Sequence, residues 1–253
     1  MQLPKGKKVY FASDNHLGAP TLAESAPRER FFVQWLDEIK EDVGVLFLLG
    51  DLFDFWFEYK TVVPKGFVRV LGKLAELADA GIPIHFFVGN HDMWMLDYLE
   101  KEIGIKVHYE PKEFTFNKKT FFIGHGDGLG PNDKGYKRMK KLFTSRFFQW
   151  CFRWLHPDIG MRLGHYLSVK NKLISGEEDA VFLGEENEWL VHYANRKQKE
   201  KERDYYVFGH RHIPLDISIK PNAHYINLGD WISHYTYGVF DGKQLKLNTW
   251  KPA

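Results

Sequence analysis

The sequence contains little cysteine, no long apolar run and almost no net charge. One cysteine, Cys151, in 253 residues excludes an intramolecular disulfide framework and a zinc cluster built from cysteines. The longest apolar stretches, such as Val45–Leu49, are far too short to cross a bilayer, and the first residues lack the apolar segment of a signal peptide. Because 35 Lys and Arg balance 33 Asp and Glu, no overall charge indicates a nucleic-acid-binding protein. We therefore expect a soluble, cytoplasmic protein.

The composition is that of a chain that folds. Hydrophobic residues make up 44% of the sequence and aromatic residues 16%, which provides a sizeable core and excludes disorder of the whole chain. The length fits one large domain or two modest ones. Because no internal repeat and no low-complexity linker divides the sequence, we expect a single domain over residues 1–253.

Positive charge is concentrated in one segment. Residues 133–172 contain ten Lys and Arg against two acidic residues, so the remainder of the chain is acidic. The same segment holds a group of bulky aromatic residues: Phe143, Phe147, Phe148, Trp150, Phe152 and Trp154. One interpretation places these side chains in the core of helices, with the charges on a solvated face. The other makes the segment a surface or lid for a partner that is both anionic and apolar.

Short apolar runs recur along the chain, and each leads into a cluster of Gly, Asp, Asn or His. Continuous apolar runs of this length are typical of strands that are buried on both faces. The runs are Val9–Ser13, Val45–Leu49, Ile84–Val88, Phe121–Ile123 and Tyr205–Phe208.

The intervening segments complete the prediction of a layered α/β fold. Apolar residues recur at helix spacing over Arg28–Lys40 and Val68–Ala78. The last part of the chain predicts a closing β meander with a hairpin turn at Asp241-Gly242; its strands are Tyr225–Leu228, Tyr237–Phe240 and Leu245–Trp250. We expect an α/β layered sandwich that is interrupted by a helical insertion over about residues 131–201.

Side chains that can bind metal ions follow the five early strands. Strand ends in an α/β scaffold collect residues from distant parts of the sequence, so these side chains are expected to share one crevice. The set combines carboxylate, amide and imidazole groups without a thiolate, which suits Mn²⁺, Fe or Zn²⁺ better than an all-oxygen cage. Its members are Asp14, His16, Asp51, Asn90, His91, His125, His210 and His212.

The spacing of these residues supports a shared site. Asp14 and His16 are two residues apart, so their side chains point to the same side of an extended backbone, and His210 and His212 repeat this spacing. Asp51 is well placed to bridge two cations about 3.5–4 Å apart. Each motif alone could be an ordinary turn or bend. Five in succession, each after an apolar run, favour a two-metal site.

In order and type, these motifs resemble those of the calcineurin-like metallophosphoesterase superfamily. The matching segments are Asp14-Asn15-His16, Gly50-Asp51-Leu52-Phe53-Asp54, Gly89-Asn90-His91-Asp92, Gly124-His125 and Gly209-His210-Arg211-His212. The resemblance implies a four-layer αββα sandwich with a dinuclear metal centre that often contains Mn²⁺. It assigns the first metal to Asp14, His16, Asp51 and His212, and the second to Asp51, Asn90, His125 and His210.

The resemblance also implies roles beside the metals. Two cations would neutralise the phosphate and acidify a water that attacks phosphorus in line. His91 would sit over the departing oxygen, where it donates a proton or stabilises the transition state. Asp54 matches the position that orients this histidine in many members, although an ordinary acid at a helix start is an equally good interpretation. Asp92 is interpreted as a partner of the ligands or as a helix cap.

Within the superfamily, the chain most resembles the UDP-2,3-diacylglucosamine hydrolases of lipid A biosynthesis. The shared segments are Ser13–Gly18, Leu49–Trp56, His125–Leu129, Asn132–Tyr136 and Leu228–Trp231. Such enzymes cleave the pyrophosphate at the α-phosphorus, giving UMP and 2,3-diacylglucosamine 1-phosphate. The implied substrate contacts are Asn90, His91, Asp133, Ser168, Asn171, Lys172 and His210. The basic, aromatic segment would then be a lid that binds diphosphate and acyl chains, or that rests on the inner-membrane surface.

One residue departs from this pattern and keeps alternatives open. The well-known hydrolases of the pathway carry Arg after the ligand Asn, whereas this chain carries His91. The substrate could therefore be another phosphodiester or a water-soluble nucleotide pyrophosphate. A non-catalytic scaffold is disfavoured because all seven ligand positions hold competent residues. A nuclease is disfavoured because bulky aromatics interrupt the positive charge, although these side chains could also stack on bases.

Overall fold

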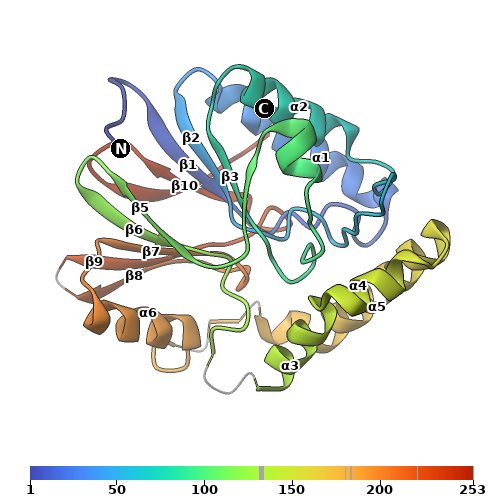
Figure 1. The fold of residues 1–253 in the computed structure, drawn as a ribbon. Helices are drawn as coiled ribbons and strands as arrows, with labels where there is room; N and C mark the ends of the chain where they lie inside the picture. The colour runs from blue at the N-terminus through green and yellow to red at the C-terminus, as the bar shows by residue number, and fades with distance from the viewer. Residues whose placement is uncertain (131–133, 180, 183, 221, 253) are drawn as a thin grey trace.

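Two β-sheets lie face to face in the computed structural model, and helices cover both outer faces (Figure 1). The structure describes residues 1–130, 134–179, 181–182, 184–220 and 222–252. Across the first sheet, the strands are β11 (Leu245–Thr249), β10 (Thr236–Phe240), β1 (Lys8–Ala12), β2 (Val43–Leu48), β3 (Ile84–Phe87) and β4 (Lys106–His108). Across the second, they are β5 (Lys112–Phe116), β6 (Lys119–Ile123), β7 (Tyr205–Phe208), β9 (Ala223–Leu228) and β8 (Pro214–Lys220).

Strands β1 to β4 are parallel to one another, as are β6, β7 and β9. The ends of parallel strands meet at one edge of a sheet, so the loops after β1, β2, β3, β6 and β7 are brought together. All five predicted apolar runs form strands, and no boundary differs from the prediction by more than two residues. The predicted α/β sandwich is therefore confirmed.

The apolar runs are continuous because the strands are covered on both faces. In β1, Val9 and Phe11 point between the sheets, where they join Phe121 and Ile226 of the second sheet. The alternate side chain Tyr10 faces the helices that cover the first sheet. A strand with solvent on one face would instead show polar residues at every second position.

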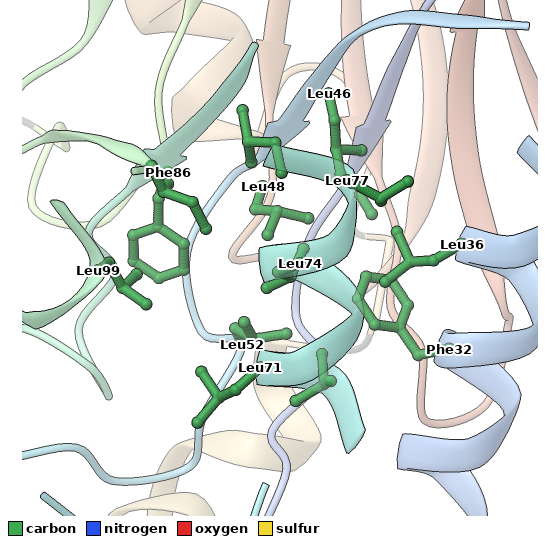
Figure 2. Close-up of a cluster of buried hydrophobic side chains, with 14 of the residues drawn as sticks. Phe32, Leu36, Leu46, Leu48, Leu52, Leu71, Leu74, Leu77, Phe86 and Leu99 are labelled. Atoms are coloured by element: carbon green, nitrogen blue, oxygen red, sulfur yellow. The ribbon is translucent and has the colours of Figure 1, made fainter. Parts of the chain in front are cut away.

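Two helices cover the first sheet, α1 (Leu22–Ile39) and α2 (Val68–Asp79). Figure 2 shows their apolar side chains packed on the strands: Phe32 and Leu36 from α1, Leu71, Leu74 and Leu77 from α2, and Leu46 and Leu48 from β2. Helix α1 begins six residues before the predicted Arg28. Thr21 accounts for this early start, because its hydroxyl oxygen accepts a hydrogen bond from the Glu24 backbone amide at 3.2 Å.

The outer face of the second sheet is covered by α6 (Trp189–Glu200). Leu190 and Tyr193 of α6 belong to one buried cluster with Tyr206 of β7 and Tyr225 of β9. Helix α6 falls inside the range expected for the insertion, residues 131–201, yet it forms the fourth layer of the sandwich. The expected insertion therefore contains a helix of the sandwich itself.

Three helices of the expected insertion lie beside the layers (Figure 1): α3 (Lys134–Phe143), α4 (Arg146–Arg153) and α5 (Pro157–Asp179). We call them the insertion helices. A short π-helical turn, η1 (Leu99–Ile103), precedes β4. No helix in the described ranges is long and apolar enough to cross a membrane.

The predicted closing β meander is wrong in one respect. Strands β10 and β11 form the expected antiparallel hairpin, and the Asp241 carboxylate accepts the backbone amides of Lys243 and Gln244 in its turn. Strand β9, however, pairs with β7 and β8 in the other sheet. The chain crosses between the sheets after β9, because Leu228 and Phe240 both fill the core between them.

Candidate metal centre

The predicted metal ligands meet at the edge of the sandwich where the parallel strands end. Their ligand atoms form groups in which all atoms lie within 4.8 Å of one another. The groups are Asp14, His16 and His212; His16, Asp51 and His91; and Asp51, His125 and His210. Because His16 is shared by the first and second groups and Asp51 by the second and third, the three groups form one continuous cluster. Asn90 joins it through Oδ1, which lies 3.1 Å from Nε2 of His125.

The backbone that carries these side chains is strained. Residues Asp14, His16, Asp51, His210 and His212 have φ values of 57°, 44°, 52°, 71° and 55°. Residues other than glycine rarely adopt this left-handed region, and each such residue costs about 1–3 kcal/mol. Strain gathered at one set of ligands indicates that the fold holds them in place for function.

Glycines before the ligands permit the close approach of the loops. A Cβ atom on Gly89 would overlap the carboxylate of Asp51, and one on Gly209 would overlap the side chains of Ser13 and Asp14. The Gly-Asn and Gly-His pairs of the motifs are thus required by packing at the centre, because any larger residue would push one ligand loop away from the next.

In Asp14 and Asp51, one carboxylate oxygen accepts a backbone amide, and the other oxygen faces the cluster. Asp14 accepts the His210 amide on Oδ2 at 2.9 Å, and Asp51 accepts the His91 amide on Oδ1 at 2.9 Å. Oδ1 of Asp14 is buried and accepts no hydrogen bond from any described residue. Oδ2 of Asp51 lies 3.3 Å from Nε2 of His125 and 3.7 Å from Nε2 of His16. A buried carboxylate oxygen without a donor is costly unless a cation occupies the position.

The histidines are oriented by their other ring nitrogens. Nδ1 of His125 lies 2.6 Å from the Leu49 carbonyl oxygen, and a carbonyl can only accept, so Nδ1 carries the proton. Nδ1 of His16 lies 3.2 Å from Oδ1 of Asp54. In both residues Nε2 is left to face the cluster, as a metal-binding histidine requires. Together with the orphaned Asp14 oxygen, these orientations fit a divalent cation.

Burial and neighbouring charges shift the pKa values of the side chains in the cluster. Burial raises the pKa of Asp14. Burial also opposes ionisation of Asp51, but the charges of His125 and His91 outweigh it and hold the pKa of Asp51 well below its usual range. Burial likewise disfavours the charged form of His125, yet the Asp51 carboxylate raises the pKa of this imidazole to about 10. Burial, with His125 nearby, lowers the pKa of His210 to about 3.

His91, Asp54 and Ser168 form a second group beside the cluster. Nδ1 of His91 lies 3.0 Å from the Asp54 carbonyl oxygen and 2.9 Å from Oγ of Ser168. Oδ1 of Asp54 is closer to Nδ1 of His16, at 3.2 Å, than to Nδ1 of His91, at 3.7 Å. Asp54 thus contacts both His91 and a candidate metal ligand, and its role in orienting His91 stays a prediction.

The remaining predicted substrate contacts are not placed by the structure. Asp133 lies outside the described residues. Asn171 and Lys172 fall within α5, but their side chains are also outside the described part of the chain. Their assignment stays a prediction.

Three further residues support the ligands and were not identified from the sequence. Oδ2 of Asp230 lies 3.7 Å from Nδ1 of His212. Arg211, between two ligands, donates to both carboxylate oxygens of the buried Glu188 at 3.1 and 2.9 Å. Asp230 could have been identified from the sequence, because it lies in the Leu228–Trp231 segment that resembles the hydrolases. Nothing near Glu188 in the sequence indicates its partner, because the pair forms across 23 residues.

The insertion helices expose an aromatic surface. Every residue of α4 is described and none is buried; Phe147, Trp150 and Trp154 are 63%, 55% and 76% exposed. Phe152 differs from these residues because its ring packs against Phe57 and Trp94 of the sandwich. The interpretation of these aromatics as helix core is therefore wrong for most of α4. Their side chains instead form an apolar surface within the basic segment.

Comparisons with known proteins identify the class. The family model described as calcineurin-like phosphoesterase matches residues 7–214. The chain belongs to this family, and it is a metal-dependent hydrolase.

Individual relatives narrow the comparison. The chain is 38% identical to a UDP-2,3-diacylglucosamine hydrolase of Porphyromonas gingivalis, over 96% of this chain and 97% of the relative. It is 25% identical to a UDP-2,3-diacylglucosamine hydrolase of Actinobacillus succinogenes, over 88% and 92%. Among solved structures, it is similar to Yfce, a phosphoesterase from E. coli, with a TM-score of 0.48 and 17% identity over 96% and 92% of the two chains.

Proposed function

We propose that the protein hydrolyses the pyrophosphate of UDP-2,3-diacylglucosamine, giving UMP and 2,3-diacylglucosamine 1-phosphate, a step of lipid A biosynthesis. The observation that carries the proposal is the 38% identity to a hydrolase of this name over nearly the full length of both chains. The ligand cluster supplies the chemistry that the substrate needs, and the exposed aromatic surface supplies apolar area for its acyl chains.

The centre is proposed to hold two divalent cations, with Mn²⁺ as the physiological metal and Fe or Zn²⁺ as alternatives. Asp14, His16, Asp51 and His212 would hold one cation; Asp51, Asn90, His125 and His210 would hold the other. The mixture of carboxylate, amide and imidazole donors supports this choice. When bound, the cations neutralise phosphate charge and acidify the attacking water.

The side chains around the centre perform the remaining work. Asn90 and His210 would also contact the substrate diphosphate. His91 has Nδ1 held by the Asp54 carbonyl and Ser168, and it lies beside His16 and Asp51 in one group of the cluster. From there it would donate a proton to the departing oxygen or stabilise its charge. Asp133, Ser168, Asn171 and Lys172 are proposed as contacts to the sugar and phosphates.

The insertion helices are proposed to contact the inner-membrane surface from the cytoplasm. Helix α4 exposes Phe147, Phe148 and Trp150, and Trp154 is exposed directly after it. Basic residues accompany these aromatics along residues 133–172. Exposed aromatic side chains beside Lys and Arg suit an anionic bilayer, from which an acylated substrate would be drawn. The same surface would act as a lid over the acyl chains.

The decisive experiment is Mn²⁺-dependent hydrolysis of UDP-2,3-diacylglucosamine, with products identified by mass, beside the deacylated UDP-sugar. We expect UMP and the lipid monophosphate from the acylated compound and much less product from the deacylated one. If neither is cleaved while a generic diester is, the substrate assignment is wrong and the phosphoesterase class remains. His91, where the pathway enzymes carry Arg, would then account for a different substrate.

A further inference from the structure

Helix α5 meets the sandwich along a face of small residues. Gly160, Gly164 and Ser168 are spaced four residues apart, so they share one face of the helix. A Cβ on Gly164 would overlap the ring of Phe55, and one on Gly160 would overlap the Tyr59 hydroxyl. Small residues at these positions allow α5 to lie directly on the loop that follows Asp54.

Ser168 makes the polar contact at the end of this face. It is only 8% exposed, although most described residues near it on α5 are exposed. Its hydroxyl donates to Oδ2 of Asp54 at 2.7 Å, and Nδ1 of His91 lies 2.9 Å from Oγ of Ser168. The Asp54 carbonyl, 3.0 Å from Nδ1 of His91, can only accept, so Nδ1 is the donor toward Ser168 as well. One hydroxyl therefore accepts from His91 and donates to Asp54.

We propose that Ser168 is a positioning residue that makes the orientation of His91 depend on the seating of α5. If α5 moves away, Nδ1 of His91 loses one of its two partners, and the imidazole is held less firmly beside the centre. Turnover of every substrate then falls, including substrates too small to touch the insertion helices. This goes beyond the proposed function, because it does not depend on the identity of the substrate.

The other role proposed for Ser168, a direct contact with the substrate sugar or phosphate, would not have this effect by itself. That role predicts a higher KM for the UDP-sugar lipid and no effect on a small chromogenic diester. The two roles are separated by measuring kcat and KM for bis(p-nitrophenyl) phosphate with Mn²⁺.

The first test compares Ser168→Ala with Ser168→Thr. We expect Ser168→Ala to lower kcat for the diester about 10- to 100-fold, the scale of a lost hydrogen bond to a charged group, with little change in KM or metal content. Ser168→Thr keeps the hydroxyl and should restore most of the lost kcat. Ser145→Ala, at a serine before α4 whose side chain caps no described amide, is the matched control. Full kcat in Ser168→Ala, or loss of its metal, would overturn the proposal.

The second test is independent of activity. Limited proteolysis should cut the insertion helices faster in Ser168→Ala, which removes the contacts to His91 and Asp54, and in His91→Ala, which removes the first of these. The double variant should be cut no faster than Ser168→Ala, because that change already removes the contact to His91. Gly164→Ala should also loosen α5, whereas Gly135→Ala, in α3 with nothing near its Cβ position, should not. If the two single variants are cut at the wild-type rate, α5 and His91 are not coupled. A failure to cleave the UDP-sugar lipid would leave both tests intact.

Discussion

The carboxylate of Asp54 lies closer to His16 than to His91: its Oδ1 is 3.2 Å from Nδ1 of His16 and 3.7 Å from Nδ1 of His91. Since Nε2 of His16 faces the cluster, Asp54 orients a candidate metal ligand. We expect Asp54→Ala to weaken Mn²⁺ binding about 10- to 100-fold, the usual effect of removing a partner of a metal ligand. Isothermal titration with Mn²⁺ measures this change. Unchanged affinity with a lower kcat would instead show that Asp54 acts through His91 alone.

Asp51, like His16, belongs to two groups of the cluster, and it is the ligand proposed to bridge both cations. We expect Asp51→Ala to abolish both metal loading and hydrolysis, because one substitution removes a donor from both proposed cations. Metal content by mass spectrometry and diester turnover check the result. Asp158→Ala is the control, because Asp158 lies on α5 with a side chain that is 82% exposed. An Asp51→Ala protein with two metals and full rate would exclude the bridging role.

His91 is expected to act on the reaction and not on metal binding. We expect His91→Ala to lower kcat about 10²–10⁴-fold, the usual scale of general-acid catalysis, with metal content unchanged. His156→Ala, at an exposed histidine before α5, is the matched control. Loss of metal in His91→Ala would make His91 a ligand, as its place beside His16 and Asp51 in one group also permits.

The exposed aromatic side chains of α4 should matter for lipids only. We expect replacing Phe147 and Trp150 with Ser to lower turnover of the acylated substrate and co-sedimentation with anionic vesicles, because apolar contact area is lost. Turnover of the small diester should not change. Val68→Ser, at an apolar residue of α2 that is 77% exposed, is the control. Equal losses for both substrates would indicate that the two side chains stabilise the fold.

The half-buried His85 predicts a pH-dependent stability. Burial first, and then His108, Lys106 and Lys112, lower its pKa to about 4, against about 6.5 in an unfolded chain. Between these values the unfolded chain binds more protons, so the free energy of unfolding falls as the pH drops from about 6.5 toward 4. Urea denaturation at pH 7.5 and 5 measures the loss. In His85→Phe the loss should be smaller; an equal loss would exclude His85 as its source.

Much of the fold could be predicted from the sequence because burial leaves a local trace. The five early strands are apolar runs since both faces of each strand are covered. The edge strands β4, β5 and β8 were not predicted, because all three mix polar and apolar residues: Lys106–His108, Lys112–Phe116 and Pro214–Lys220. The sheet of β9 was also not predictable, since an apolar run does not say which neighbour it pairs with.

The candidate metal centre also combines features that the sequence predicts with features that depend on the tertiary structure. The sequence by itself determined which residues could bind metal, because ligand chemistry is a property of side-chain type and the motifs follow apolar runs. Only the tertiary structure decided which atoms face the cluster, that Asp54 serves His16 as well as His91, and that Ser168 reaches both Asp54 and His91 from a helix 77 residues beyond His91. The physical reason is that a hydrogen bond depends on distance and direction in space, and separation along the chain carries neither.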